Sequence, residues 1–159
     1  KFNSIKKNKF IEFPKMGFSI LKNIIKKIKK NTGGILLIDY GYVSKSNIDT
    51  LQSIKNHKKN KVFENLGDAD ITSLVNFELL NEYFIKNKLE VKNIVSQSIF
   101  LKTMGIIERA NILSKKMNFK DKADLFYRLK RLLSPNDMGE LFKVIFAYKS
   151  KNKNFIGFG

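Results

Sequence analysis

The chain has 159 residues, 43% of them hydrophobic, which suits a single domain with a buried core. It contains no cysteine and one histidine, His57, so disulfides, thiolate chemistry and metal sites built from several histidines are excluded. No apolar run approaches the roughly 18 residues of a membrane-spanning helix, and we expect neither a metal site nor membrane insertion.

The formal net charge of +17 favours an anionic partner such as nucleic acid or a membrane surface. Most of the cations are lysines, and arginine occurs only at Arg109, Arg128 and Arg131. Since arginine is the preferred residue for reading bases and for bidentate phosphate contacts, we expect no specific nucleic-acid site. A lysine bias along the whole chain is more typical of an AT-rich genome than of a binding patch.

Residues 14–30 have the pattern of an amphipathic helix with a lysine-rich outer face. The apolar residues recur at helical spacing: Phe18, Leu21, Ile25 and Ile28. Pro14 suits the first turn, and Gly33 with Gly34 ends the helix. A basic amphipathic helix can bind a membrane, but this one leads directly into a strand, so we expect it to cover a sheet.

The predicted strand Ile35–Asp39 begins with four apolar residues without alternation, ends on an acid and is bounded by turn signals. This pattern is typical of a strand buried on both faces, as in a parallel sheet. In open α/β sheets, ligands bind beyond the carboxyl ends of the strands. We therefore expect Asp39, Tyr40 and Gly41 at the functional edge, where Asp39 either lines a cleft or caps the following turn.

Residues 42–70 are polar, and a connection of this length in a compact domain is usually functional or disordered. We expect one helical turn within Ile48–Lys55. Asn76 then predicts the N-cap of a helix that ends near Lys86, and Leu89–Val95 alternates loosely as a strand. The first strand, this helix and this strand suit a right-handed βαβ crossover.

Two more helical stripes follow, over Ile106–Met117 and Leu125–Leu133, before a turn at Met138 and Gly139. Leu141–Tyr148 is the last apolar run and predicts a final strand, and residues 149–159 predict a frayed tail. The sequence contains no glycine-rich phosphate loop and no serine elbow. The residues alone therefore predict an α/β domain with an acid at a strand end and a polar loop over it.

Several short segments occur in an order that is specific as a set: Gly34–Gly41, Asp49–Gln52, His57, Gly67–Thr72, Gln97, Arg109 and Met138–Val144. Together they resemble the MidA-like S-adenosylmethionine-dependent methyltransferases across roughly residues 11–148. Asn76 departs from the pattern, because the family usually has aspartate before the phenylalanine.

The resemblance implies the C-terminal half of a class I methyltransferase sheet, a Rossmann-like α/β fold with a helical insertion before the last strand. The strands would be the fifth, sixth and seventh of that sheet: Ile35–Asp39, Val91–Ser96 and Leu141–Tyr148. The family's glycine-rich cofactor loop lies in its N-terminal half. We therefore expect residues 1–148 to be the C-terminal part of the domain and residues 149–159 a tail, which agrees with a start at Lys1 rather than methionine.

The implied activity is methyl transfer from S-adenosylmethionine to a protein arginine, on a subunit of respiratory complex I. The implied location is the bacterial cytoplasm or the mitochondrial matrix, and the isolated fragment is expected to be inactive. A basic module that binds a protein or RNA, or an assembly factor without chemistry, is the alternative. No residue is assigned to the cofactor.

The resemblance also suggests the site residues. Three are expected to be catalytic and to line one cavity: Asp39, His57 and Asp70. Four are expected to bind substrate: Tyr40, Gly41, Asp68 and Thr72. Carboxylates suit a guanidinium and histidine suits a base. The alternatives are that His57 is a solvated loop residue and that Asp70 or Thr72 caps a short helix.

Overall fold

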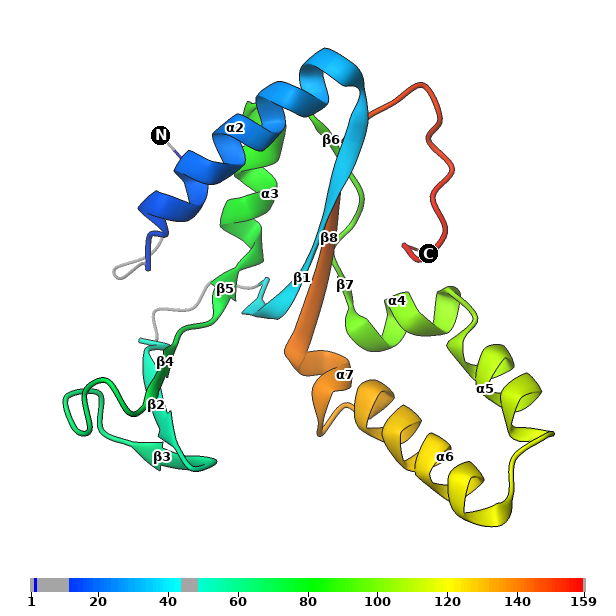
Figure 1. Ribbon diagram of the computed structural model, residues 1–159. Coiled ribbons are helices and arrows are strands. Elements are labelled where there is room, and N and C mark those ends of the chain that lie inside the picture. Colours follow the sequence, from blue (N-terminus) through cyan, green and yellow to red (C-terminus); the bar gives the residue numbers. More distant parts are fainter. Residues whose placement is uncertain (1, 3–11, 44–48, 159) are drawn as a thin grey trace.

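The computed structural model describes Phe2, residues 12–43 and residues 49–158 (Figure 1). The first helix, α2 (Lys15–Asn31), forms as its periodicity predicts and buries Phe18, Leu21, Ile25 and Ile28. It ends where Thr32 adopts a positive φ of 61°. Because the strand begins directly afterwards, Gly33 and Gly34 start the strand rather than cap the helix.

Two long strands form the centre of the main sheet. β1 (Gly33–Tyr42) pairs antiparallel with β8 (Phe142–Lys149) from Gly33 opposite Lys149 to Tyr40 opposite Phe142. Three short strands complete it: β5 (Val75–Asn76) on β1, and β6 (Glu90–Val91) and β7 (Val95–Ser96) on β8. The strand expected at Val91–Ser96 is therefore divided in two.

One face of this sheet is covered by helices. Figure 1 shows α2 and α3 (Phe77–Lys86) on the same side of the β1–β8 ribbon. The core lies between them and the sheet: Phe18, Leu21, Ile25, Ile28, Phe77, Leu79, Leu80, Phe84, Leu89, Ile145 and Ala147. Ile35 and Leu37 of β1 pack against this core. The predicted helix at Asn76–Lys86 is confirmed, since the Asn76 side chain caps α3.

The expectation that β1 is buried on both faces is wrong for the described residues. Leu36, Ile38 and Tyr40 alternate with the core residues and are each 44% exposed. Successive side chains of a strand point to opposite faces, and only the face under α2 and α3 is covered here.

A second, three-stranded sheet occupies part of the polar connection. It contains β2 (Gln52–Lys55), β3 (Lys58–Asn60) and β4 (Asp70–Thr72), in the order β3-β2-β4, and we call it the small sheet. The helical turn expected within Ile48–Lys55 is wrong where it is described, because Gln52–Lys55 is a strand; Ile48 lies outside the described residues. Asn56 and His57 both have positive φ, which suits a tight hairpin turn between β2 and β3.

The helical insertion contains α4 (Gln97–Thr103), α5 (Ile106–Ser114), α6 (Phe119–Leu133) and α7 (Met138–Leu141). Gln97 Nε2 donates to the Leu132 carbonyl at 3.0 Å, which ties α4 to the end of α6. The turn expected at Met138 and Gly139 is the short helix α7. A side chain on Gly139 would meet the Leu133 carbonyl, so glycine permits the close approach of α6.

The described part of the tail, residues 149–158, packs against the sheet rather than fraying. Phe155 and Phe158 pack against Phe146 of β8, with ring centroids 4.8 Å and 5.9 Å away. Lys153 pairs with Glu90 at 3.0 Å and fastens the segment to β6. The tail therefore covers the β8 part of the sheet's second face, beside α4 in Figure 1. Within the described ranges, no helix is both long and apolar enough to cross a bilayer.

A substitution at Gly41 tests the packing of β1 against β5 and α3. A side chain at Gly41 would collide with the Val75 carbonyl and the Phe77 ring. We expect Gly41→Ala to lower the free energy of unfolding by about 1–3 kcal/mol, as overpacking does. The matched control is Gly17→Ala in α2, whose added carbon meets only Pro14 at 3.6 Å and should stabilise the helix. Urea unfolding of both variants measures the effects, and equal midpoints would contradict the close approach.

Candidate functional site

A groove of about 650 Å³ lies at the carboxyl end of β1, where an α/β sheet places its ligands. We call it the strand-end groove. Tyr40 of β1 and Leu141 of α7 contribute to it, together with residues of the small sheet and its connections: Asp49, Thr50, Leu51, Gln52, Ile54, Thr72, Ser73 and Leu74. Of the three residues predicted at the functional edge, Tyr40 lines this groove.

The groove has an apolar body with a few polar groups. Leu51, Leu74 and Leu141 provide aliphatic surface, and the Tyr40 ring lies 4.1 Å from that of Phe142. Among the described residues that line the groove, Asp49 is the only carboxylate, and one of its oxygens accepts the Leu51 amide at 2.9 Å. Such a lining suits a ligand with an aliphatic stem and a polar or cationic end.

Thr50 holds the floor of the groove together. Its backbone amide and its hydroxyl donate to the two carboxylate oxygens of Glu12, at 3.1 Å and 2.5 Å. The same hydroxyl accepts the Leu74 amide at 2.9 Å. One side chain therefore links the segment before α2, the start of the small sheet and its exit, and we call this arrangement the Thr50 bridge.

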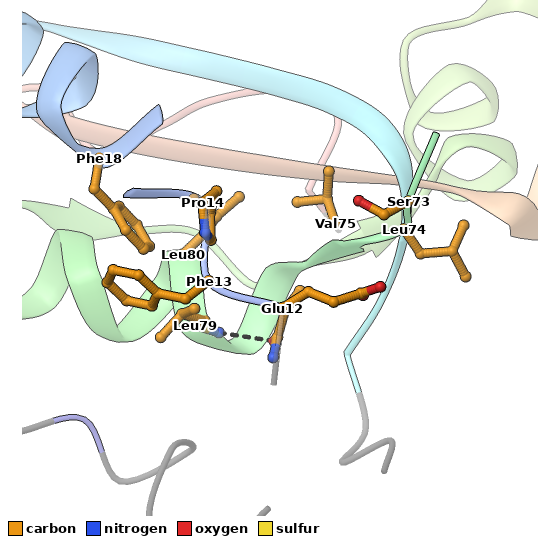
Figure 2. Close-up of a pocket in the computed structure, with 10 residues that line it drawn as sticks. Glu12, Phe13, Pro14, Phe18, Ser73, Leu74, Val75, Leu79 and Leu80 are labelled. Carbon is orange, nitrogen blue, oxygen red and sulfur yellow. Dashed lines mark hydrogen bonds between the residues drawn. The ribbon is translucent and has the colours of Figure 1, made fainter. Parts of the chain in front are cut away.

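A second pocket of about 210 Å³ lies beside this bridge (Figure 2). Figure 2 shows Phe13, Pro14 and Phe18 facing Leu79 and Leu80 of α3. The Phe13 and Phe18 rings are 5.2 Å apart, and Glu12 lines the pocket on the side of the bridge. We treat the larger groove as the candidate site because it lies at the carboxyl end of β1.

Asn76 is the last residue of β5 and the N-cap of α3, and it is 7% exposed. Its Oδ1 accepts the Leu79 amide at 3.0 Å, which is the cap of α3, while its Nδ2 forms no hydrogen bond of normal geometry with the described residues. Burial, followed by the charge of Glu12, raises the pKa of Tyr42, and the nearby Asn76 amide opposes this effect. A neutral residue here avoids placing a buried carboxylate in the pocket that Glu12 also lines.

The predicted site residues lie in different places. Tyr40 and Thr72 line the strand-end groove. Asp39 does not line it: its Oδ1 accepts the Tyr40 amide at 2.8 Å, and alternation along β1 directs it to the face opposite Tyr40. Gly41 is buried against Val75 and Phe77, so its described role is packing.

The remaining predicted residues lie on the small sheet, outside the groove lining. His57 is exposed at the β2–β3 turn, and Asp70 is exposed on β4 opposite Ile54. Asp68 pairs with Lys55 at 3.6 Å. Asp39, His57 and Asp70 therefore share neither of the two pockets beside the strand end. The described residues contain no group of three or more side chains suited to a metal ion.

Sequence reasoning did not identify Glu12, Asp49, Thr50 and Gln52 as site residues. Glu12 and Thr50 are 38 positions apart, and no local pattern indicates their contact. In the sequence, Asp49–Gln52 is one of the ordered segments that carry the family resemblance, without a role of its own. One signal in the sequence points to this segment. It lies in the connection that follows the carboxyl end of β1, where α/β sheets place their ligands.

The Thr50 bridge can be tested by a matched pair of substitutions. Thr50→Val keeps the shape but leaves the Leu74 amide and the Glu12 carboxylate without the hydroxyl, so the free energy of unfolding should fall by about 1–3 kcal/mol. Thr50→Ser retains the hydroxyl and should cost less than half as much. Denaturant unfolding measures both, and equal losses would contradict the bridge.

Tyr42 predicts a dependence on alkaline pH. Its folded-state pKa lies above the ordinary 10.0, so its contribution to stability is complete below pH 10 and is lost as pH rises through the folded pKa. Tyr42→Phe should therefore lose less stability than the parent between about pH 8 and about pH 11, measured by urea unfolding. Burial also raises the pKa of Tyr83 and Tyr148, so part of the loss should persist. Identical losses would contradict this role.

The chain resembles known proteins in sequence and in fold. Residues 1–95 match a family described as S-adenosyl-L-methionine-dependent methyltransferases. The chain is 30% identical over 124 residues to the mitochondrial protein arginine methyltransferase NDUFAF7 of Danio rerio, covering 78% of this chain and 29% of that protein. It is 31% identical over 139 residues to the Caenorhabditis elegans homologue, covering 87% of this chain and 32% of that protein.

Solved structures agree. A Burkholderia thailandensis protein bound to S-adenosyl-homocysteine is 26% identical, with a TM-score of 0.63 over 74% of this chain and 32% of that one. A second structure from the same organism has a TM-score of 0.66 at 24% identity, over 80% of this chain and 36% of that one, and supports the fold alone. The chain therefore spans about a third of the length of the proteins that it matches, and it belongs to the MidA-like family of S-adenosylmethionine-dependent methyltransferases.

Proposed function

We propose that this chain forms the substrate-side wall of a methyltransferase that modifies a protein arginine. The observation that carries the proposal is the strand-end groove, which lies at the carboxyl end of β1 in a chain of this family. The relatives from Danio rerio and Caenorhabditis elegans are named as protein arginine methyltransferases, which supports an arginine acceptor. Because the chain spans about a third of those relatives, the activity is proposed for the larger assembled protein.

The groove fits an acceptor better than the cofactor. S-adenosylmethionine supplies an electrophilic methyl group when it is bound. The strand that ends at the groove is followed by the connection to the small sheet, rather than by a glycine-rich turn into a helix. The described part of the groove lining has one carboxylate and much aliphatic surface, which suits the stem and head of an arginine side chain.

The chain's residues would then orient the acceptor and exclude water. Leu51, Leu74 and Leu141 would cover the aliphatic stem. The Asp49 carboxylate would accept from the guanidinium, a pairing that favours planar, bidentate geometry. Tyr40 and Thr72 are proposed as further substrate contacts, with Gly41 and Asp68 retained from the family resemblance.

A guanidinium that gains a methyl group must lose a proton, so the site needs an acceptor for it. We retain Asp39, His57 and Asp70 as candidates in the assembled protein. The proposed acceptor protein is a subunit of respiratory complex I, which follows from the family resemblance. The relatives are named as mitochondrial, which supports the mitochondrial matrix as the proposed location.

The isolated chain should not bind S-adenosylmethionine measurably. The reason is that the described residues provide an acceptor groove and no glycine-rich turn after a strand. Calorimetric titration of the 159-residue chain measures this. Micromolar binding to the chain alone would falsify the division of roles between the acceptor wall and the rest of the protein.

A test of the acceptor role requires a complete enzyme, because methyl transfer must be measured. We suggest the Danio rerio relative with its matched stretch replaced by this chain, assayed for methyl transfer to a protein substrate. In this chimera, Asp70→Ala should lower the rate about 100-fold or more, as loss of a proton acceptor does. Asp124→Ala, on the exposed part of α6, should leave the rate unchanged. Full turnover by the Asp70 variant would remove Asp70 from the mechanism.

A further inference from the structure

The hairpin formed by α5 and α6 carries apolar side chains that the described residues leave uncovered at one end. Figure 1 shows the hairpin projecting from the β1–β8 ribbon, with the connection between the two helices at the end away from that ribbon. We call residues 111–120, which contain the end of α5, this connection and the start of α6, the hairpin tip. Large apolar residues of the tip are exposed: Ile112 by 61%, Leu113 by 39%, Met117 by 36% and Phe119 by 88%.

Hydrogen bonds fix the backbone of the tip. The hydroxyl of the buried Ser114 donates to the Asn111 carbonyl at 3.0 Å. At the start of α6, the Asn118 side chain accepts the Asp121 amide at 2.9 Å and donates to the Asp121 carboxylate at 2.9 Å. Phe119 follows this cap directly as the first residue of α6. The exposure of Phe119 therefore belongs to an ordered turn of the fold.

The tip is also basic throughout. Its ionisable residues are Lys115, Lys116 and Lys120, all of them exposed, and no acid occurs in the sequence between Glu108 and Asp121. Lysine is common along the whole chain, so lysines alone would not distinguish this segment. The distinction is that these lysines accompany exposed apolar side chains with no acid among them. That combination is typical of segments that bind anionic bilayer surfaces.

We propose that the hairpin tip docks on the surface of a bilayer that contains anionic lipids. Phe119 and its aliphatic neighbours enter the boundary between headgroups and acyl chains, while Lys115, Lys116 and Lys120 lie among the lipid phosphates. This contact stays at headgroup depth, so it requires no membrane-spanning helix. The inference goes beyond the proposed function and does not depend on what the strand-end groove accepts.

The apolar residues of the tip favour a bilayer over a nucleic acid. Single-stranded nucleic acids bind where aromatic rings stack on bases beside cations. Phe119 is the one aromatic residue of the tip, and the other exposed apolar side chains are aliphatic: Ile112, Leu113 and Met117. Aliphatic side chains cannot stack on bases, whereas hydrocarbon removes them from water.

The cations and the position of the tip favour a bilayer over a protein partner. Arginine is enriched and lysine is depleted where proteins meet, yet all three arginines lie outside the tip, at Arg109, Arg128 and Arg131. The tip is the projecting end of a hairpin, which a flat bilayer surface can receive without a matching cavity (Figure 1). A second copy of the chain would bring the same net charge of +17 and would be repelled.

Flotation of the 159-residue chain with lipid vesicles tests the proposal. We expect binding to phosphatidylcholine vesicles that contain phosphatidylserine, and much weaker binding to phosphatidylcholine alone. The double substitution Lys115→Gln with Lys116→Gln should weaken binding about 25-fold, at about fivefold for each cation. The matched control is Lys26→Gln with Lys27→Gln on the exposed side of α2, which removes the same charge and should weaken binding less than about threefold.

A second pair of variants measures the apolar contribution. Phe119→Ser should weaken vesicle binding about tenfold, because a ring that leaves water on docking is lost. The control is Phe63→Ser in the small-sheet connection, since Phe63 is also 88% exposed, and it should leave binding unchanged. The substituted side chains are all exposed, so the urea midpoints of these variants should equal that of the parent chain.

Three results would overturn the docking of the tip: no binding to the anionic vesicles, equal losses in the two lysine pairs, or equal losses in the two phenylalanine variants. Titrations with oligouridylate and with polyglutamate examine the other partners. If Phe119→Ser weakens binding to either polymer more than binding to vesicles, the tip serves a nucleic acid or an acidic protein and the bilayer proposal is rejected. Methyl transfer does not enter these measurements, so failure of the proposed function would leave their outcome intact.

Discussion

The antiparallel ladder between β1 and β8 is the constraint on which the rest of the fold depends. It pairs Gly33 with Lys149 and Tyr40 with Phe142, so it joins segments more than a hundred positions apart in the sequence. Gly34 permits the close approach, since a side chain there would meet the Phe146 ring. β6 and β7 attach to the other edge of β8, and α2 leads into β1, so these elements are placed directly by this pair.

The ladder also determines what the site contains. Pairing brings the Tyr40 ring beside that of Phe142. Because Phe142 directly follows α7, the same pairing places Leu141 in the groove, together with residues of the small sheet. The other side of the groove depends on a separate contact, the Thr50 bridge to Glu12. The strand-end groove is therefore built by two long-range contacts, and neither the ladder nor the bridge alone would define its lining.

Local patterns predicted the parts that local physics determines. The stripe of α2 and the Asn76 cap of α3 were predicted from spacing and capping preference, because both depend on residues within one or two turns. The small sheet was missed because its strands are short and polar. The packed tail was missed because Phe155 finds its partner, Phe146, only after β8 has joined the sheet. The cavity expected for Asp39, His57 and Asp70 depends on how the long polar connection folds back over the strand end, which no local pattern determines, so it stays a prediction for the assembled protein.

The burial expected for both faces of β1 and the exposure observed on one of them differ for a physical reason. An apolar run without alternation, such as Ile35 to Ile38, is selected where both faces of a strand are removed from water. Helices cover the side of Ile35 and Leu37, whereas Leu36 and Ile38 keep 44% of their surface exposed. A strand that functioned with one wet face would be expected to carry polar residues at those alternate positions. The composition of β1 is therefore that of an inner strand of a larger sheet, which agrees with the greater length of the proteins that the chain resembles.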